Sequence, residues 1–95
     1  LTGFPEPDEK EIKGSVASVR LDSILALALG GSRSSMISYI ENGKVFVNGK
    51  MIASNGYVLK DNDVVSVRGA GKFRFGQVLH HTKKGRNMVA VYRYQ

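Results

Sequence analysis

A chain of 95 residues has room for one compact domain and not for a second hydrophobic core. Hydrophobic residues make up 42% of it and charged residues 23%, a composition typical of globular rather than disordered proteins. The absence of cysteine excludes disulfides, thiolate nucleophiles and cysteine-based metal sites. No apolar run approaches the roughly 20 residues needed to cross a bilayer, and no secretory signal pattern is present. Because the chain opens at Leu1 rather than at methionine, we expect it to be a piece of a longer protein.

The net charge of +6 is distributed unevenly along the chain. Residues 1–11 sum to −3, and the remainder sums to +9. Residues 64–95 contain seven bases and no acid. Such a field on a small domain favours a polyanionic partner, although a solvated basic surface is the alternative interpretation.

The first elements are predicted from composition and apolar spacing. Residues 1–11, with two prolines among acids, predict an acidic tail or linker, which precedes a single domain over residues 12–95. Residues 13–19 are rich in β-branched and small side chains and predict a strand. A helix is predicted next from five apolar residues with helical spacing, Leu21, Ile24, Leu25, Ala28 and Leu29. Asp22 stands where a carboxylate stabilises the amides of a helix start, and Gly30-Gly31 ends the helix.

A second helix follows after a very short loop. Either Ser32 or Ser34 can cap its start, and Asn42-Gly43 ends it. We expect it to turn three apolar side chains inward, Met36, Ile37 and Ile40. The short connection predicts a compact αα-hairpin.

The remainder of the chain reads as strands and turns. Asn48-Gly49, between residues 44–47 and 50–52, is a strong signal for a type I′ hairpin. Turns are expected at residues 55–56 and 60–63, and strands at residues 64–68, at 73–75 between glycines, and at 78–80 and 88–92 around a basic turn at 82–86. The fold class is therefore α+β, a short αα-hairpin packed on a mostly antiparallel sheet with an extra C-terminal β-hairpin.

Candidate catalytic groups have structural explanations. His80 and His81 are adjacent on a predicted strand and point to opposite faces, so they cannot share one metal ion. Asp61 and Asp63 lie in a turn that favours Asp and Asn for backbone reasons. The glycines near residue 70 precede no helix, so they do not form a phosphate loop. We expect no catalytic residue, no metal site and no cofactor.

The two helix starts are better candidates for binding phosphates. Arg20 precedes the first helix, and Ser32-Arg33-Ser34 opens the second. Each start offers amides and an arginine fork that fits phosphate oxygens. The alternative is a salt bridge with Asp22 or Glu41, and whether the two arginines share a side stays open at this point. Lys44 and Lys50 flank the predicted Asn48-Gly49 turn. They are candidate phosphate contacts, and the alternative is that they are charges that keep the edge of the sheet soluble.

These residues form an ordered pattern that resembles the S-four (S4) RNA-binding domain, also called the alpha-L motif. The resemblance spans about residues 19–68 and rests on four segments, Arg20-Leu21-Asp22, Ser32-Arg33, Gly43 to Lys50 and Val64 to Val67. The following residues, with Thr82 to Arg86, are similar to the carboxy-terminal segment of YlmH-type proteins. Two departures are visible, Ser35-Met36 where the family often has lysine or alanine, and Asn62-Asp63 where it usually has Gly-Asp.

The resemblance implies a function. It implies a non-catalytic, ribosome-associated module that binds structured rRNA or tRNA and has the large ribosomal subunit as its partner, in translation or in the rescue of stalled ribosomes. We accordingly expect a cytoplasmic monomer with no membrane and no small-molecule substrate. The RNA-binding residues carried over by position are Arg20, Ser32, Arg33, Ser34, Lys44, Asn48 and Lys50. Secondary RNA contacts are expected at Arg68, Lys72, Lys83, Lys84 and Arg86.

Physical considerations favour RNA over duplex DNA. A second helix of about nine residues, about 13 Å long, is too short to read a major groove. We expect shape and charge to dominate RNA recognition, because the aromatic residues are better explained by core packing than by base stacking. These residues are Phe46, Phe73, Phe75, Tyr92 and Tyr94.

Two other function classes stay open. One is an accessory domain of an RNA-modifying enzyme whose catalytic part lies elsewhere. The other is a β-grasp carrier protein, suggested by residues 45–49, although the chain ends in Tyr92 to Gln95 and not in Gly-Gly.

Overall fold

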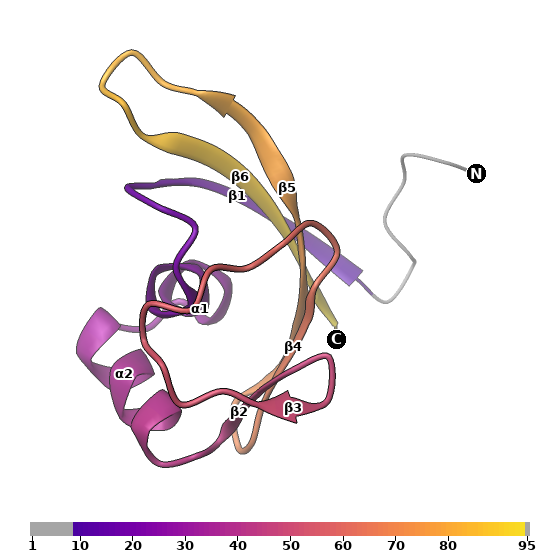
Figure 1. Cartoon of the computed structure of the whole chain (residues 1–95). Helices are drawn as coiled ribbons and strands as arrows, with labels where there is room; N and C mark the ends of the chain where they lie inside the picture. Colours follow the sequence, from indigo (N-terminus) through magenta and orange to yellow (C-terminus); the bar gives the residue numbers. More distant parts are fainter. Residues whose placement is uncertain (1–8, 95) are drawn as a thin grey trace.

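The computed structural model describes residues 9–94, and this part of the chain is a six-stranded antiparallel sheet with two short helices on one face (Figure 1). The strands lie side by side in the order β1-β6-β5-β4-β2-β3. The elements in chain order are β1 (Glu9–Val16), α1 (Leu21–Leu29), α2 (Arg33–Glu41), β2 (Val45–Val47), β3 (Lys50–Met51), β4 (Val64–Val67), β5 (Gly71–His81) and β6 (Asn87–Tyr94). The α+β class, the αα-hairpin and the extra C-terminal hairpin, formed by β5 and β6, are confirmed.

Local capping signals determine where both helices begin and end. Gly30 ends α1 in the left-handed conformation (φ 72°), where its N–H donates to the carbonyl of Ala26. Ser32, and not Ser34, caps α2, because its Oγ accepts the N–H of Ser35 at 3.2 Å. Asn42 then ends α2. The helices thus follow the predicted bounds.

The core lies between the helices and the sheet. From α1 it takes Leu21, Ile24, Leu25 and Ala28, and from α2 it takes Met36 and Ile40. Ile37, expected to point inward, is only half-buried. From the sheet the core takes alternate residues of β2, β4, β5 and β6, namely Val45, Val47, Val65, Val67, Phe73, Phe75, Val89 and Val91. This alternation leaves the other face of the sheet to polar and half-buried side chains.

Two asparagines adopt positive φ at the expected turns. Asn48 (φ 52°) and Gly49 (φ 86°) join β2 to β3, as a type I′ hairpin requires. Asn62 (φ 69°) occupies the turn before β4, where the S4 pattern usually has glycine. Asparagine tolerates this conformation, so the turn is kept.

The first strand begins earlier than its sequence indicates. Residues 9–11 were expected in the acidic tail, but they belong to β1, which pairs with β6 from Glu9↔Tyr94 to Val16↔Asn87. Glu9 is buried and forms a 3.4 Å ion pair with Arg74. Residues 17–19, expected in the strand, lie outside it because the chain bends after Val16. The rest of the expected tail, residues 1–8, lies outside the described residues.

The expected break at Gly76 is wrong. β5 runs without interruption from Gly71 to His81, with a shift of register against β6 between Phe75 and Gln77. A Cβ on Gly76 would meet Tyr92 Cε2 at 2.6 Å and the carbonyl oxygen of Ala90 at 2.8 Å. Glycine is therefore used here for close packing of two strands, and not to end one.

Candidate nucleic-acid interface

Arg20 and Arg33 meet at one buried carboxylate. Nη2 of Arg20 lies 3.3 Å from Oδ2 of Asp22, and Nη2 of Arg33 lies 3.4 Å from the same oxygen. The Asp22 side chain is 1% exposed, whereas those of Arg20 and Arg33 are 41% and 58% exposed. The two arginines therefore share a side of the molecule, with their charges at the surface and the acid beneath them. We call these three residues the arginine cluster.

The start of α1 is held by a distant loop. The N–H groups of Leu21 and Asp22 donate to the carbonyls of Tyr57 (2.8 Å) and Asn55 (3.3 Å). The Ser23 N–H donates to Oδ1 of Asp22 at 2.7 Å. The expectation that both helix starts offer unpaired amides is therefore wrong for α1, because the loop and Asp22 occupy them.

The start of α2 differs in this respect. Its cap satisfies the N–H groups of Ser35 and Met36, both through Ser32. Among residues 9–94, no hydrogen-bond partner is found for the amides of Arg33 and Ser34. Ser32, Arg33 and Ser34 are all exposed. This helix start therefore retains two donors beside the Arg33 guanidinium.

Lys44 and Arg68 form a second basic site. The Arg68 N–H donates to the Lys44 carbonyl at 2.9 Å, which fixes the two backbones side by side. A shallow cavity of about 450 Å³ lies here, lined by Asn42, Gly43, Lys44, Arg68 and Gly69. Lys44 also places its Nζ 5.9 Å from the centre of the Tyr39 ring on α2. The structure thus places Lys44 beside Arg68, which was expected only as a secondary RNA contact.

Asn48 and Lys50 are not joined to the arginine cluster. The Asn48 amide donates to Oδ1 of Asp63 and its Oδ1 accepts the Val64 N–H, both at 3.0 Å. Its side chain thus connects the β2–β3 hairpin to the turn before β4. Lys50 is exposed on β3, which forms one edge of the sheet, and no ion pair or hydrogen bond within residues 9–94 links its side chain to the cluster.

The basic turn between β5 and β6 separates into two parts. Lys83 and Lys84 are exposed at its tip. Arg86 instead turns back onto β1, where its Nε donates to Ser15 Oγ at 3.1 Å and its Nη2 to the Ser15 carbonyl at 2.9 Å. His80 and His81, close to this turn, are exposed. Within residues 9–94 no group of three or more potential ligands could hold a metal ion.

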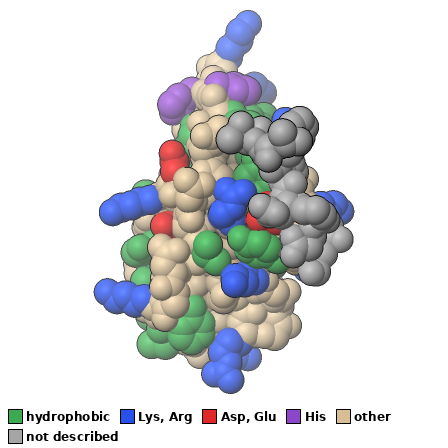
Figure 2. All heavy atoms as spheres, turned by 90° about the vertical axis from the view of Figure 1, so that its right-hand side faces the viewer, with side chains coloured by type: hydrophobic (Ala, Val, Ile, Leu, Met, Phe, Trp, Pro, Cys, Tyr) green, Lys and Arg blue, Asp and Glu red, His purple; other side chains and the backbone are tan. Residues whose placement is uncertain are grey.

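Lys72 lies on the face of the sheet away from the helices. Its Nζ stands 5.4 Å from the centre of the Tyr94 ring, and Arg74 stacks on Tyr92 at 4.4 Å. Figure 2 views this face and shows basic side chains interspersed with hydrophobic and acidic ones. Of the aromatic residues, Phe73 and Phe75 are core, while Phe46, Tyr92 and Tyr94 are half-buried. Lys72 is therefore not part of the surface that carries the arginine cluster.

Comparison with known proteins identifies the class to which this arrangement belongs. Residues 19–65 match the model of the S4 domain family, described as "S4 domain". This segment contains both helices, the arginine cluster and the Asn48-Gly49 hairpin. The resemblance drawn from the sequence is confirmed, and the chain contains an S4 RNA-binding domain.

One similar protein extends the match to nearly the whole chain. The ribosome-associated protein quality control protein P2 of Bacillus subtilis, a protein of the YlmH type, is 30% identical over 90 residues. The alignment covers 95% of this chain and 35% of the relative, so the chain spans about a third of that protein's length. Among solved structures, the 30S ribosomal protein S4e from Thermoplasma acidophilum is 20% identical with a TM-score of 0.49, over 84% of this chain and 38% of that one. Within residues 9–94, neither helix is long and apolar enough to cross a membrane.

Proposed function

We propose that this chain is a non-catalytic module that binds structured rRNA or tRNA through shape and phosphate charge. The observation that supports it best is the arginine cluster, in which one buried carboxylate holds two exposed guanidinium groups at the starts of both helices. A guanidinium held in place loses less conformational entropy on binding phosphate than a freely rotating one.

The proposed RNA surface extends from this cluster. Arg33 adds the two unpaired amides at the start of α2, and Lys44 with Arg68 adds the second basic site. We include Lys50 on the β3 edge and Lys83 and Lys84 at the tip of the β5–β6 hairpin as outlying phosphate contacts. Asn48 contributes by shaping its hairpin. Both helices have nine residues, too short to read a major groove, so a folded RNA is the better partner.

We further propose that the module works on the ribosome, in the cytoplasm, as a monomer. The name of the Bacillus subtilis relative refers to ribosome association and protein quality control. A role in translation or in the rescue of stalled ribosomes, with contacts to the large subunit, fits that relative and the basic surface of this chain.

A matched pair of charge-neutralising variants tests RNA binding. Arg33→Gln removes one charge from the cluster without placing a new acid beside Asp22. Lys10→Gln removes one charge from β1, between Glu9 and Glu11. Titration of a fluorescent rRNA or tRNA hairpin should show affinity about ten-fold lower for Arg33→Gln, since a charged hydrogen bond contributes about 1.5–3 kcal/mol. Lys10→Gln should stay within about two-fold of wild type. Equal affinities for Arg33→Gln and wild type would contradict the proposal.

A further inference from the structure

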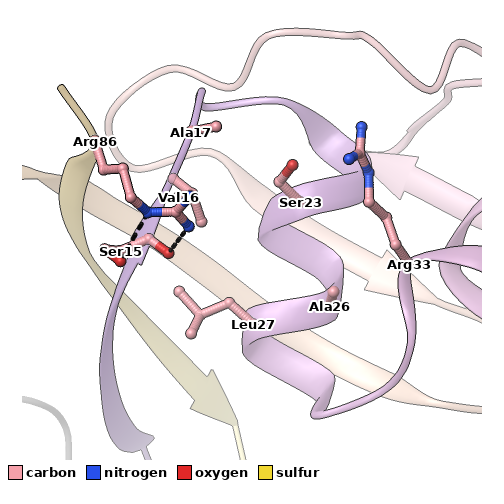
Figure 3. Close-up of a pocket in the computed structure, with 8 residues that line it drawn as sticks. All are labelled: Ser15, Val16, Ala17, Ser23, Ala26, Leu27, Arg33 and Arg86. Atoms are coloured by element: carbon pink, nitrogen blue, oxygen red, sulfur yellow. Dashed lines mark hydrogen bonds between the residues drawn. The ribbon is translucent and has the colours of Figure 1, made fainter. Parts of the chain in front are cut away.

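A groove of about 360 Å³ lies between the end of β1 and helix α1 (Figure 3). It is lined by Ser15, Val16, Ala17, Ser23, Ala26, Leu27, Arg33 and Arg86. The residues come from the end of β1, α1 and the start of α2, which are consecutive in the chain, and from the turn before β6, which brings Arg86 from a distant part of the sequence. No acid is among the residues that line it.

The groove is open because the side chains around Leu27, its large apolar residue, are small. Leu27 leans from α1 toward β1, and Gly14 permits this, since a Cβ at Gly14 would meet Leu27 Cδ1 at 2.5 Å. Alanine and serine at positions 17, 23 and 26 leave space above Leu27. Leu27 thus forms an apolar floor to the groove. Phosphate binding alone requires no such apolar surface.

Two fixed guanidinium groups flank this floor. Figure 3 shows Arg86 on one side and Arg33 on the other, with Leu27 and Ser23 between them. Arg86 is held by Ser15, and Arg33 by Asp22. Each arginine uses two of its five N–H groups in these bonds, so three remain for a ligand.

We propose that the groove receives one unpaired nucleotide of the bound RNA, with its base on the apolar floor and its flanking phosphates on Arg33 and Arg86. This inference rests on the proposed function and adds to it the kind of RNA that is preferred. Sites for small ligands begin at about 300 Å³, so one nucleotide is a suitable occupant. Proteins that read RNA commonly stack unpaired bases on aromatic side chains or on arginine guanidinium planes, and bases turned out of a helix also pack between apolar side chains. This groove offers Leu27 and two guanidinium groups. A fully paired stem keeps its bases stacked and can use only the two cations.

Two RNA hairpins that differ by one unpaired nucleotide test the proposal. The wild-type chain should bind the bulged hairpin about ten-fold more tightly than the fully paired one. Ala17→Leu fills the groove without changing charge, so it should abolish this preference and leave affinity for the paired hairpin unchanged. Ala53→Leu, at an exposed alanine outside the groove, is the matched control and should keep the preference.

A second pair of variants covers the case in which Ala17→Leu does not fold. Arg86→Gln should reduce the preference several-fold, whereas Lys84→Gln, at the exposed tip, should weaken binding to both hairpins equally. A 2-aminopurine at the unpaired position should change its emission on binding wild type, and should change it less on binding Arg86→Gln.

The outcomes separate this inference from the proposed function. If both hairpins bind wild type equally, or if Ala17→Leu keeps the preference when folded, the groove proposal is wrong and RNA binding stands. If neither hairpin binds, the proposed function fails. If a free mononucleotide or a peptide saturates the groove at micromolar concentration in wild type and not in Ala17→Leu, the groove serves a soluble ligand, which also contradicts the proposal.

Discussion

Arg33 and Asp22, eleven residues apart and on different helices, are joined by hydrogen bonds of 3.4 Å from both Nε and Nη2 of the arginine to one carboxylate oxygen. Nη2 of Arg20, the residue before α1, donates to the same oxygen at 3.3 Å. The acid is inaccessible and both bases are accessible. Asp22 therefore orients positive charge outward, although it carries negative charge itself.

This relationship predicts an unusual result for Asp22→Asn. Net charge rises by one, so simple attraction would strengthen RNA binding. We expect binding about three- to ten-fold weaker, because both arginines lose the group that positions them. The free energy of unfolding should fall by about 1–2 kcal/mol, since hydrogen bonds to a charged group are lost but the arginines remain hydrated. Anisotropy titration and urea denaturation measure the two effects, and tighter RNA binding would contradict the positioning role.

The Asn48 side chain predicts a stability effect with two separable parts. Asn48→Ala loses the hydrogen bonds to Asp63 and Val64 and also strains a residue at φ 52°. Asn48→Gly loses the bonds but adopts that conformation freely. We expect a loss of about 2–3 kcal/mol for alanine and about 1–2 kcal/mol for glycine, by chemical denaturation. If the RNA affinity of either folded variant fell ten-fold, Asn48 would contribute to RNA binding as well as to stability.

The tip of the β5–β6 hairpin and Arg86 should respond differently to substitution. Lys83→Gln with Lys84→Gln should make the plot of log affinity against log salt shallower by at most about 2, with an unchanged Tm. Arg86→Gln should lower the Tm by several degrees, because it loses two hydrogen bonds to Ser15 worth about 1 kcal/mol. A Tm for Arg86→Gln equal to wild type would show that this anchor does not stabilise the fold.

Tyr92 gives a prediction in alkaline solution. Burial, then the charge of Glu11 and the hydrogen bond to it (3.3 Å), raise the pKa of Tyr92 above its ordinary value of 10.0, against a smaller opposing effect of Arg74. The folded state therefore holds this proton more tightly than the unfolded state. The resulting stability is present below pH 10 and is lost as the pH rises through the raised pKa.

The substitution Glu11→Gln should lower that pKa toward 10.0. Ultraviolet titration of the tyrosines measures it, and Tyr92→Phe identifies which band belongs to Tyr92. Superimposable titration curves for Glu11→Gln and wild type would show that Glu11 does not act on the phenol.

Local signals in the sequence were sufficient for the helices and turns. Gly30, Ser32 and the Asn48-Gly49 pair each act through the backbone within a few residues, so their positions predict where elements begin and end. The candidate arginines at the helix starts could be named for the same reason. The resemblance to the S4 domain rests on the order in which these arginines and the hairpin follow one another along the chain, and no single motif establishes that order.

Contacts between distant segments could not be predicted in this way. Ser15 and Arg86 are 71 residues apart, and nothing in either neighbourhood indicates the bond between them. The loop that pairs with the amides of Leu21 and Asp22 lies more than 30 residues further along the chain, so the expectation of unpaired amides at the start of α1 is wrong. The acidic character of residues 9–11 favours a tail when these residues are considered alone. Their partners in the structure, strand β6 and Arg74, lie near the other end of the chain, so the local sequence does not reveal the strand.

The salt dependence of RNA affinity tests the central claim most directly. For wild type on a structured rRNA or tRNA hairpin, log affinity should fall with log salt at a slope of about −3 to −5, as expected when about five phosphates are neutralised. The double variant Arg20→Gln/Arg33→Gln should be shallower by about 1.5 to 2, and Lys10→Gln should match wild type. A wild-type slope near zero, or a double variant with the wild-type slope, would contradict an RNA surface centred on these two arginines.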